Sequence, residues 1–157
     1  MKTNAMRILD GMGISYEVLE YDIDPRENED IAMYTSQKLG IPAEKICKTL
    51  VMASDSNEIF VFCLPALFEV SLKKARAASG CSGIDLIKPE RLSKLTGYIR
   101  GGCSPLGMTH RYPTFIEELV QLEDFIYISG GQRGISLKIA PDDLARAAGA
   151  TFASLVS

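Results

Sequence analysis

The sequence has little of the side-chain chemistry from which metal sites and nucleophilic enzymes are built. Of its 157 residues only one is a histidine, His110, and four are cysteines, at positions 47, 63, 81 and 103. No two cysteines form a CxxC pair, and a structural zinc site needs closer ligand spacing, so we predict no metal. Widely separated cysteines are typical of free thiols in a reducing compartment.

Long apolar runs and an excess of basic charge are also lacking. No run approaches the ~20 apolar residues of a membrane-spanning helix, and the first residues lack the apolar segment of a signal peptide, so we expect a cytoplasmic protein. Lys and Arg number 17 against 20 Asp and Glu, a net charge of -3. This balance argues against an extended nucleic-acid groove, but it leaves recognition of a single RNA terminus open.

Motifs of nucleophilic and phosphate-binding enzymes are missing as well. No serine or cysteine lies in a G-x-S-x-G elbow, and the Walker pattern G-x-x-x-x-G-K-[ST] is absent. A Cys–His dyad would have to recruit His110, which lies in a polar run that we expect to be a solvated loop. Cys103 lies in a glycine-rich segment and is the most suggestive thiol, although a small buried cysteine is the commoner role.

The hydrophobic residues, 46% of the chain, suffice for one domain with a substantial core, spanning residues 1–157. Periodicity predicts helices at residues 3–12, 30–39, 72–79, 89–95 and 141–148. It predicts strands at residues 14–21, 48–54, 58–64, 84–87, 114–116, 125–129, 135–139 and 152–156. Strands that arrive in hairpins, with helices interspersed irregularly, favour an α+β fold with a mixed, curved sheet over a doubly wound parallel one.

Helix ends are marked by capping residues. Thr3 or Asn4 can cap the first predicted helix, and Ser71 can cap the helix at residues 72–79. Gly80 and Gly149 follow the last apolar positions of their helices, where a left-handed residue ends a helix. Between the first strand and the second helix, residues 22–28 are polar and interrupted by proline, so we expect a surface loop.

Two glycine-rich segments and one lysine stand out. Residues 97–107 (GYIRGGCSPLG) should form a shaped loop that presents main-chain N–H groups, because glycine allows close backbone approach and proline fixes the chain. Residues 129–134 (SGGQRG) form a second turn between two predicted strands. Lys48 begins an apolar strand, where a lysine either reaches to solvent or meets an anion or hydroxyl. We predict that the three meet at one small pocket.

Four motifs, in this order along the chain, carry a resemblance. They are residues 20–22 (EYD) followed by Asp24-Pro25, residues 48–51 (KTLV), and the two glycine-rich segments. With them the chain resembles the YbaK/EbsC family of free-standing aminoacyl-tRNA deacylases, which are related to the editing insertion of bacterial prolyl-tRNA synthetase. The resemblance extends from the first helix to the last and implies the fold of that family.

For the branch that acts on Cys-tRNA(Pro), the resemblance implies chemistry without a protein nucleophile, metal or cofactor. The thiolate of the mischarged cysteine attacks its own ester carbonyl and releases a cyclic thiolactone and free tRNA. The enzyme contributes by holding the reacting atoms in near-attack geometry. The implied partners are the acceptor end of tRNA(Pro), with Cys-tRNA(Cys) as a further substrate, and prolyl-tRNA synthetase in a ternary complex.

Site residues are carried over by position. Lys48 matches the family's key lysine, expected at the terminal adenosine and its 2′/3′ oxygens. Gly101 and Pro105 match a G-x-x-x-P loop whose N–H groups polarise the ester carbonyl. The expected catalytic residues are therefore Lys48 and Gly101. The expected substrate-binding residues are Tyr21, Thr49, Gly102, Cys103, Ser104, Pro105, Ser129, Gly131 and Ser136.

Ser136 departs from the family pattern. Cysteine-specific members carry an aspartate there, and a serine supplies no carboxylate, so the contact with the amino group or the specificity differs. Hydrolytic deacylation of Ala-tRNA(Pro), as in the alanine-editing relatives, is the first alternative. A non-catalytic module that binds a nucleotide, peptide or RNA end, and a hydrolase built on a converging His110 and Cys103, are the others.

Overall fold

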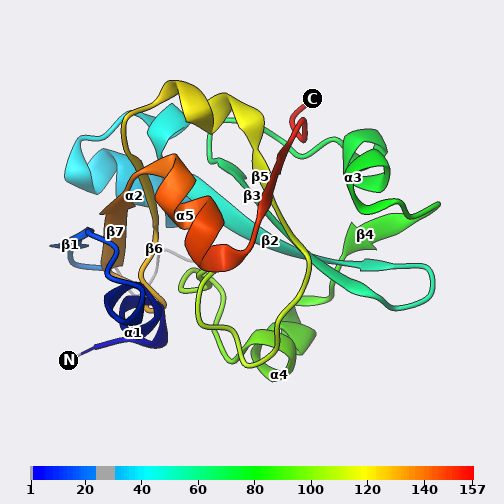
Figure 1. Ribbon diagram of the computed structural model, residues 1–157, viewed down its shortest axis with the longest axis horizontal. Helices are drawn as coiled ribbons and strands as arrows, with labels where there is room; N and C mark the ends of the chain where they lie inside the picture. The colour runs from blue at the N-terminus through cyan, green and yellow to red at the C-terminus, as the bar shows by residue number, and fades with distance from the viewer. Residues whose placement is uncertain (1, 24–30) are drawn as a thin grey trace.

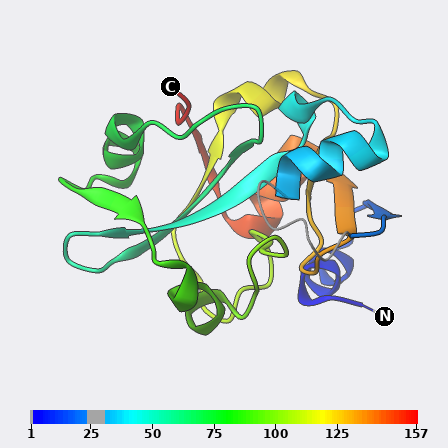
Figure 2. The same cartoon turned by 180° about the vertical axis from the view of Figure 1, so that it is seen from behind.

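The computed structural model describes residues 2–23 and 31–157. The fold is α+β with a mixed sheet, as predicted, but the strands divide into two sheets (Figures 1 and 2). The α-helices are α1 (Asn4–Gly11), α2 (Ile31–Leu39), α3 (Leu72–Ser79), α4 (Leu92–Thr96) and α5 (Pro141–Ala148). The strands are β1 (Glu17–Glu20), β2 (Cys47–Ser54), β3 (Ile59–Pro65), β4 (Ile84–Leu86), β5 (Thr114–Glu117), β6 (Ile126–Ser129), β7 (Ile135–Ile139) and β8 (Thr151–Ala153). Short 3-10 turns lie at Ala43–Lys45, Pro89–Arg91 and Glu118–Leu122.

The larger sheet has the strand order β4-β2-β3-β5-β8 and mixes both directions. Its antiparallel half is the predicted β2–β3 hairpin with β4, whereas β5 pairs in parallel with β3 and with β8. The smaller sheet, β1-β7-β6, is antiparallel. An isolated parallel bridge between Ile46 and Tyr127 joins the two sheets just before β2. Helix α5 lies on one side of the molecule and α2 on the other, as the two opposite views show.

Capping residues set the helix ends as the sequence predicts. The Ser71 side chain accepts a hydrogen bond from the Lys74 N–H at 3.2 Å, and Gly80 ends α3 in the left-handed conformation at φ 75°. Thr3 likewise accepts from the Met6 N–H at 3.2 Å and begins α1. These helix boundaries depend on contacts between residues close in the chain, so the sequence predicts them.

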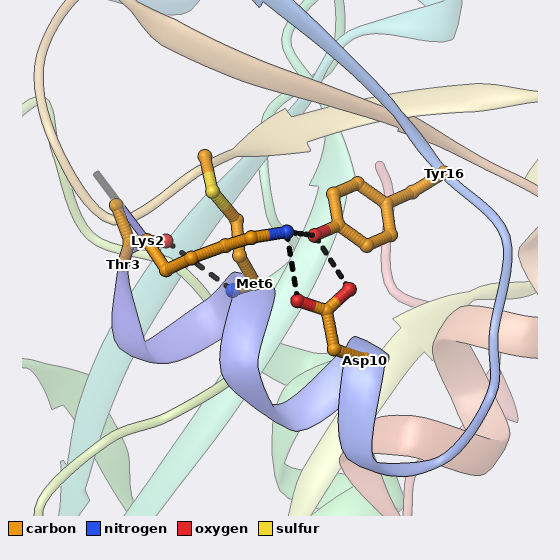
Figure 3. A network of polar contacts seen from close by, with 5 residues as sticks. All are labelled: Lys2, Thr3, Met6, Asp10 and Tyr16. Carbon is orange, nitrogen blue, oxygen red and sulfur yellow. Dashed lines mark hydrogen bonds and ion pairs between the residues drawn. The ribbon is translucent and has the colours of Figure 1, made fainter.

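A polar network holds α1 against the segment that leads into β1 (Figure 3). The Lys2 Nζ lies 2.8 Å from Asp10 Oδ2 and donates to the Tyr16 hydroxyl at 3.2 Å. That hydroxyl donates in turn to Asp10 Oδ1 at 2.9 Å. Hydrogen bonding to Lys2 lowers the pKa of Asp10. The network is exposed, so it orients α1 more than it stabilises the fold.

Some elements differ from their predictions. Strand β1 is shorter than the predicted 14–21; it lies at the edge of the smaller sheet, next to β7, and its Val18 is exposed. The predicted helix at 89–95 is a 3-10 turn followed by α4, and the predicted last strand ends early at Ala153. Residues 24–28 of the loop predicted at 22–28, the Asp24-Pro25 motif and the first residue of the predicted second helix lie outside the described residues.

A buried carboxylate closes the end of the larger sheet. Glu117 is only 1% exposed, yet its Oε1 accepts from the N–H groups of Leu155 and Val156 at 2.7 and 3.1 Å. Its Oε2 accepts from the Leu119 N–H at 2.7 Å. These bonds attach the last residues of the chain to β5.

Among the described residues, no helix is long and apolar enough to cross a membrane.

Candidate functional site

A pocket of about 370 Å³ opens where the smaller sheet, α2 and the start of β2 meet. Its volume falls in the range of small-molecule sites, roughly 300–1,000 Å³. Its walls come from five segments that are distant in the sequence. The lining residues are Tyr21, Ile31, Ala32, Thr35, Ile46, Cys47, Lys48, Thr49, Leu50, Arg100, Gly101, Cys103, Ile128, Ser129, Ile135 and Ser136. This arrangement confirms that Lys48 and the two glycine-rich segments meet at one pocket.

The charged side chains among the described residues that line the pocket are all basic. Lys48 and Arg100 line it, and none of the described lining residues is an aspartate or glutamate. Lys48 is half-buried on β2, and within the described part of the chain its ammonium group has neither an ion pair nor a hydrogen bond. An unpaired, partly desolvated cation favours a ligand with negative charge or exposed oxygens.

Thr49 follows Lys48 in the chain, and its hydroxyl has no partner among the described residues. Among the described side chains its Oγ1 is the one buried polar atom without a hydrogen bond. Burying such a group costs about 1–3 kcal/mol unless it finds a partner. Because Thr49 lines the pocket, a bound molecule can supply that partner.

The first glycine-rich segment forms one wall. Gly101 has φ 84°, and a Cβ there would lie 2.7 Å from the Cγ1 of Ile31 and 2.9 Å from the Nε of Arg133. Only glycine therefore fits the position. The Gly102 N–H donates to Ile99 O at 3.0 Å, whereas no acceptor for the N–H groups of Gly101 and Cys103 is found among the described residues. These two amides are the candidate main-chain donors of the pocket.

The second glycine-rich turn braces that wall from behind. Arg133 Nε donates to the main-chain oxygen of Arg100 at 2.8 Å. A Cβ on Gly102 would lie 3.0 Å from the main-chain nitrogen of Arg133. Ser129 accepts from the Gly131 N–H at 3.2 Å and lines the pocket itself. The two turns are therefore in direct main-chain contact, and each fixes the shape of the other.

Tyr21 and Thr35 form a polar pair at the side of α2. Thr35 Oγ1 donates to Ile31 O at 2.8 Å and lies 2.5 Å from the Tyr21 hydroxyl. Since the Thr35 proton is committed to Ile31, Tyr21 is the donor of the second bond. Burial raises the pKa of Tyr21, so its hydroxyl stays protonated at neutral pH.

Ser136 lies at the back of the pocket, only 3% exposed, and donates to Ile128 O at 3.3 Å across the β6–β7 pair. Its oxygen keeps free acceptor capacity toward the pocket, but it offers a dipole where a carboxylate would offer a full charge.

Seven of the expected site residues line the pocket and four do not. Gly102, Ser104 and Pro105, in the first glycine-rich segment, and Gly131, in the second, lie outside the lining. Ser104 is fully buried and accepts from the Leu106 N–H at 3.2 Å. Sequence reasoning missed Arg100 and Thr35. Arg100 stands inside the glycine-rich motif and could have been noticed, whereas nothing in the pattern of α2 marks Thr35.

The thiols of the pocket are not poised as nucleophiles. Burial raises the pKa of Cys103 to about 12, and a hydrogen bond with Cys63, together with burial, raises the pKa of Cys47. Both stay protonated at neutral pH, and a thiol attacks as its thiolate. His110 is exposed and lines a different pocket from Cys103. Within residues 2–23 and 31–157, no three His, Cys, Asp or Glu side chains cluster as a metal site would require.

Comparisons with known proteins found similar sequences and similar folds. Residues 30–147 match the family model of the aminoacyl-tRNA editing domain. EbsC of Enterococcus faecalis, a candidate Cys-tRNA(Pro)/Cys-tRNA(Cys) deacylase by name, is 35% identical over 156 residues, which cover 99% of this chain and 94% of the relative.

Two solved structures share the fold over essentially the whole chain. The hypothetical protein APE2540 superposes with a TM-score of 0.88 at 18% identity, covering 99% of this chain and 100% of that one. A candidate trans-editing enzyme for prolyl tRNA synthetase superposes with a TM-score of 0.85 at 24% identity, covering 100% and 99%.

Proposed function

The chain belongs to the aminoacyl-tRNA editing domain family, and from this premise we propose that it clears mischarged Cys-tRNA(Pro) as a deacylase acting in trans. Cys-tRNA(Cys) is the further substrate, since the Enterococcus faecalis relative carries both in its name. The observation that supports the proposal most is the convergence of Lys48, the Gly101–Cys103 wall and the Thr49 hydroxyl on one pocket, where Thr49 has no partner among the described residues and both lining thiols stay protonated because their pKa is raised.

The nucleophile in this proposal is the substrate's own sulfur. The cysteinyl thiol loses its proton to solvent, the sulfur forms a bond to the ester carbonyl carbon, and the bond from that carbon to the ribose oxygen breaks. The ribose oxygen takes up a proton, and a cyclic thiolactone leaves. No oxidant or reductant enters, and the protonated Cys103 thiol takes no part.

Lys48 contributes charge at the leaving oxygen. A half-buried ammonium group that has no partner among the described residues can donate to the 2′ and 3′ oxygens of the terminal ribose. Its charge stabilises the oxygen as the ester bond breaks, and the effect is larger in a pocket that excludes water. Binding and catalysis thus depend on the same side chain.

The glycine-rich wall contributes at the carbonyl. The N–H groups of Gly101 and Cys103 are main-chain donors on a wall that a neighbouring turn holds rigid. Donors held in place before the reaction stabilise the negative charge that develops on the carbonyl oxygen. The same rigidity keeps the sulfur and the carbonyl carbon in near-attack geometry.

The hydroxyl groups of Thr49, Ser129 and Ser136 replace a carboxylate at the amino group of the substrate. All three line the pocket, and each hydroxyl oxygen can accept from an ammonium group. Hydroxyl dipoles attract an ammonium group less than a carboxylate does, so we expect weaker binding of the amino acid rather than a different reaction.

The experiment is a deacylation assay on Cys-tRNA(Pro) and Ala-tRNA(Pro), with wild type, Lys48→Ala and Lys45→Ala compared. Lys45 lies three residues away and does not line the pocket, so it is the matched control. We expect wild type to deacylate Cys-tRNA(Pro). The rate of this deacylation should be roughly 100-fold lower in Lys48→Ala and unchanged in Lys45→Ala. Loss of alanine alone would instead identify a hydrolytic deacylase, and loss of neither would leave a module that binds a nucleotide or RNA end.

The proposed reaction takes place in the cytoplasm, with tRNA delivered by a partner. A chain with a net charge of -3 has few phosphate contacts to offer, so affinity for tRNA is low unless another protein holds it. Prolyl-tRNA synthetase is the proposed partner, in a ternary complex with tRNA. Tight binding of tRNA by the isolated chain in co-sedimentation would contradict this part of the proposal.

A further inference from the structure

A second pocket, of about 500 Å³, lies on the other side of the glycine-rich wall. Cys103 lines the first pocket and Pro105 lines the second, so two residues of one loop separate their walls. Two residues of extended chain span at most about 7 Å. Helices α1 and α5, which flank the second pocket, lie on the same side of the molecule in Figure 1, with the loop after α4 beside them.

The second pocket gathers arginines from three separate elements. Arg7 comes from α1, Arg111 from the loop before β5 and Arg146 from α5, and all three are exposed. His110 also lines it, and none of the described lining residues is an aspartate or glutamate. Like charges that converge without an acidic counterpart in the lining repel each other, and an anion at this position relieves that repulsion.

Existing contacts leave these guanidinium groups available. Arg146 lies 3.5 Å from Asp143 in an exposed ion pair, which is weak, and Arg7 donates to the side chain of Asn4 at 3.0 Å. Arg111 has its Nη2 3.3 Å from where a Cβ on Gly149 would lie, beside the end of α5. Each guanidinium has five N–H donors, so every arginine keeps donors for a ligand.

Apolar surface continues the pocket between the charges. Ile8 and Met12 are 40% and 41% exposed at its edge, and Tyr112 presents a half-buried ring whose hydroxyl donates to Leu95 O at 2.7 Å. Arginine side chains beside an aromatic ring and apolar surface suit a phosphodiester chain, whose phosphates alternate with sugars and bases. An acidic protein segment would be bound by the arginine charges alone and would leave the aromatic and apolar surface unused.

We propose that this second pocket binds backbone phosphates of the tRNA whose 3′ end occupies the first pocket. The inference rests on the proposed function for the identity of the RNA. Arginine binds phosphate oxygens with two parallel hydrogen bonds, and three such contacts beside the shared wall fix the register of the acceptor end. The local cluster reconciles RNA binding with a net charge of -3, because none of the described residues that line this pocket is acidic.

The test measures binding of an uncharged tRNA(Pro) transcript to the full chain by fluorescence anisotropy over a series of salt concentrations. Each phosphate contact contributes about 0.7–0.9 to the slope of log affinity against log salt. We expect the triple variant Arg7→Gln, Arg111→Gln, Arg146→Gln to lower that slope by about two to three. The control triple Lys73→Gln, Lys88→Gln, Lys94→Gln removes the same charge at exposed positions outside the pocket and leaves the slope within about one of wild type.

The outcomes separate this inference from the proposed function. An equal decrease of the salt slope in both triple variants would overturn the inference, because the net charge of the chain, and not this pocket, would then set the slope. An unchanged slope in both variants would overturn it as well. Loss of binding of inorganic phosphate or of an acidic peptide without any change for tRNA would overturn it too. Because the tRNA is uncharged, a protein that binds it through the three arginines but deacylates nothing would support the inference and refute the proposed function.

Discussion

The side chain of Arg133 donates to the main-chain oxygen of Arg100 at 2.8 Å, and this bond joins the two glycine-rich segments of the pocket. Arg100 precedes Gly101, whose N–H is one of the two candidate donors to the substrate carbonyl. The Arg133 guanidinium therefore acts on the site through the main chain, without touching the ligand cavity itself.

Loss of the Arg133 side chain should loosen the wall. We expect Arg133→Ala to lower kcat at least roughly tenfold while KM changes less, because misplaced donors weaken transition-state binding first. Steady-state deacylation kinetics measure both parameters. Gln132→Ala, an exposed neighbour on the same turn, is the control and should retain wild-type kinetics. An equal decrease of kcat in both variants would show that the hydrogen bond from Arg133 to Arg100 has no special role in catalysis.

Thr49→Val should separate stability from activity. Valine keeps the shape of threonine and removes a buried hydroxyl that has no partner among the described residues, so the free energy of unfolding should stay the same or rise by about 1 kcal/mol. If that hydroxyl binds the substrate, kcat/KM falls roughly tenfold in the same variant. Urea denaturation and deacylation kinetics measure the two effects.

Thr114→Val is the matched comparison for this experiment. Thr114 is also buried, but its hydroxyl donates to Tyr112 O at 3.0 Å. Its loss should lower the free energy of unfolding by about 1 kcal/mol, because an established hydrogen bond is removed. A lower stability of Thr49→Val would show that its hydroxyl is bonded in the folded chain and would contradict the reading of the pocket.

Glu117→Gln should destabilise the chain without touching the site. The carboxylate accepts from three main-chain N–H groups, and an amide has only one oxygen for them. We expect a loss of about 2 kcal/mol in the free energy of unfolding, since the NH₂ group would face a donor. Denaturation with urea checks this, with Glu118→Gln, at the exposed next residue, as control. A loss of equal size at both positions would show that the buried bonds are unimportant.

Stability should fall in alkaline solution. The folded-state pKa of Cys103 is raised from 9.0 to about 12 by burial, and that of Tyr98 from 10.0 to about 12. Above pH 9.0 the unfolded chain loses the Cys103 proton while the folded chain keeps it, so unfolding is favoured as the pH rises. Each group contributes a slope that approaches about 1.4 kcal/mol per pH unit between its two pKa values.

Cys103→Ala isolates this effect. The variant should show a flatter decline of the free energy of unfolding between pH 9.0 and 10.0, where only the cysteine of this pair has begun to titrate in the unfolded chain. Urea denaturation at a series of pH values gives the slope. An unchanged slope would mean that Cys103 titrates normally, and the argument against it as a nucleophile would then fail.

Local chemistry made part of the fold predictable. Ser71 and Gly80 bound α3 at both ends because a cap and a left-handed glycine act within a few residues of each other. Pairing between distant strands follows no such local signal. The parallel pairing of Val61 with Thr114 and the division into two sheets depend on how whole faces pack.

The candidate site was predictable to a similar degree. The sequence predicts that Lys48, at the start of a strand, meets the two glycine-rich segments that contain Gly101 and Ser129. All three residues line one pocket. Thr35 was missed because a threonine in the middle of a helix carries no signal until the helix is placed. Pro105 was expected at the substrate, yet the loop turns there and directs it into the second pocket.

The most direct test of the central claim compares wild-type deacylation of Cys-tRNA(Pro) with that of the same substrate carrying an S-alkylated cysteine. The account predicts that the free thiol is removed rapidly with release of the thiolactone, while the blocked substrate stays charged. Equal rates on the two substrates would contradict sulfur attack and show that water is the nucleophile.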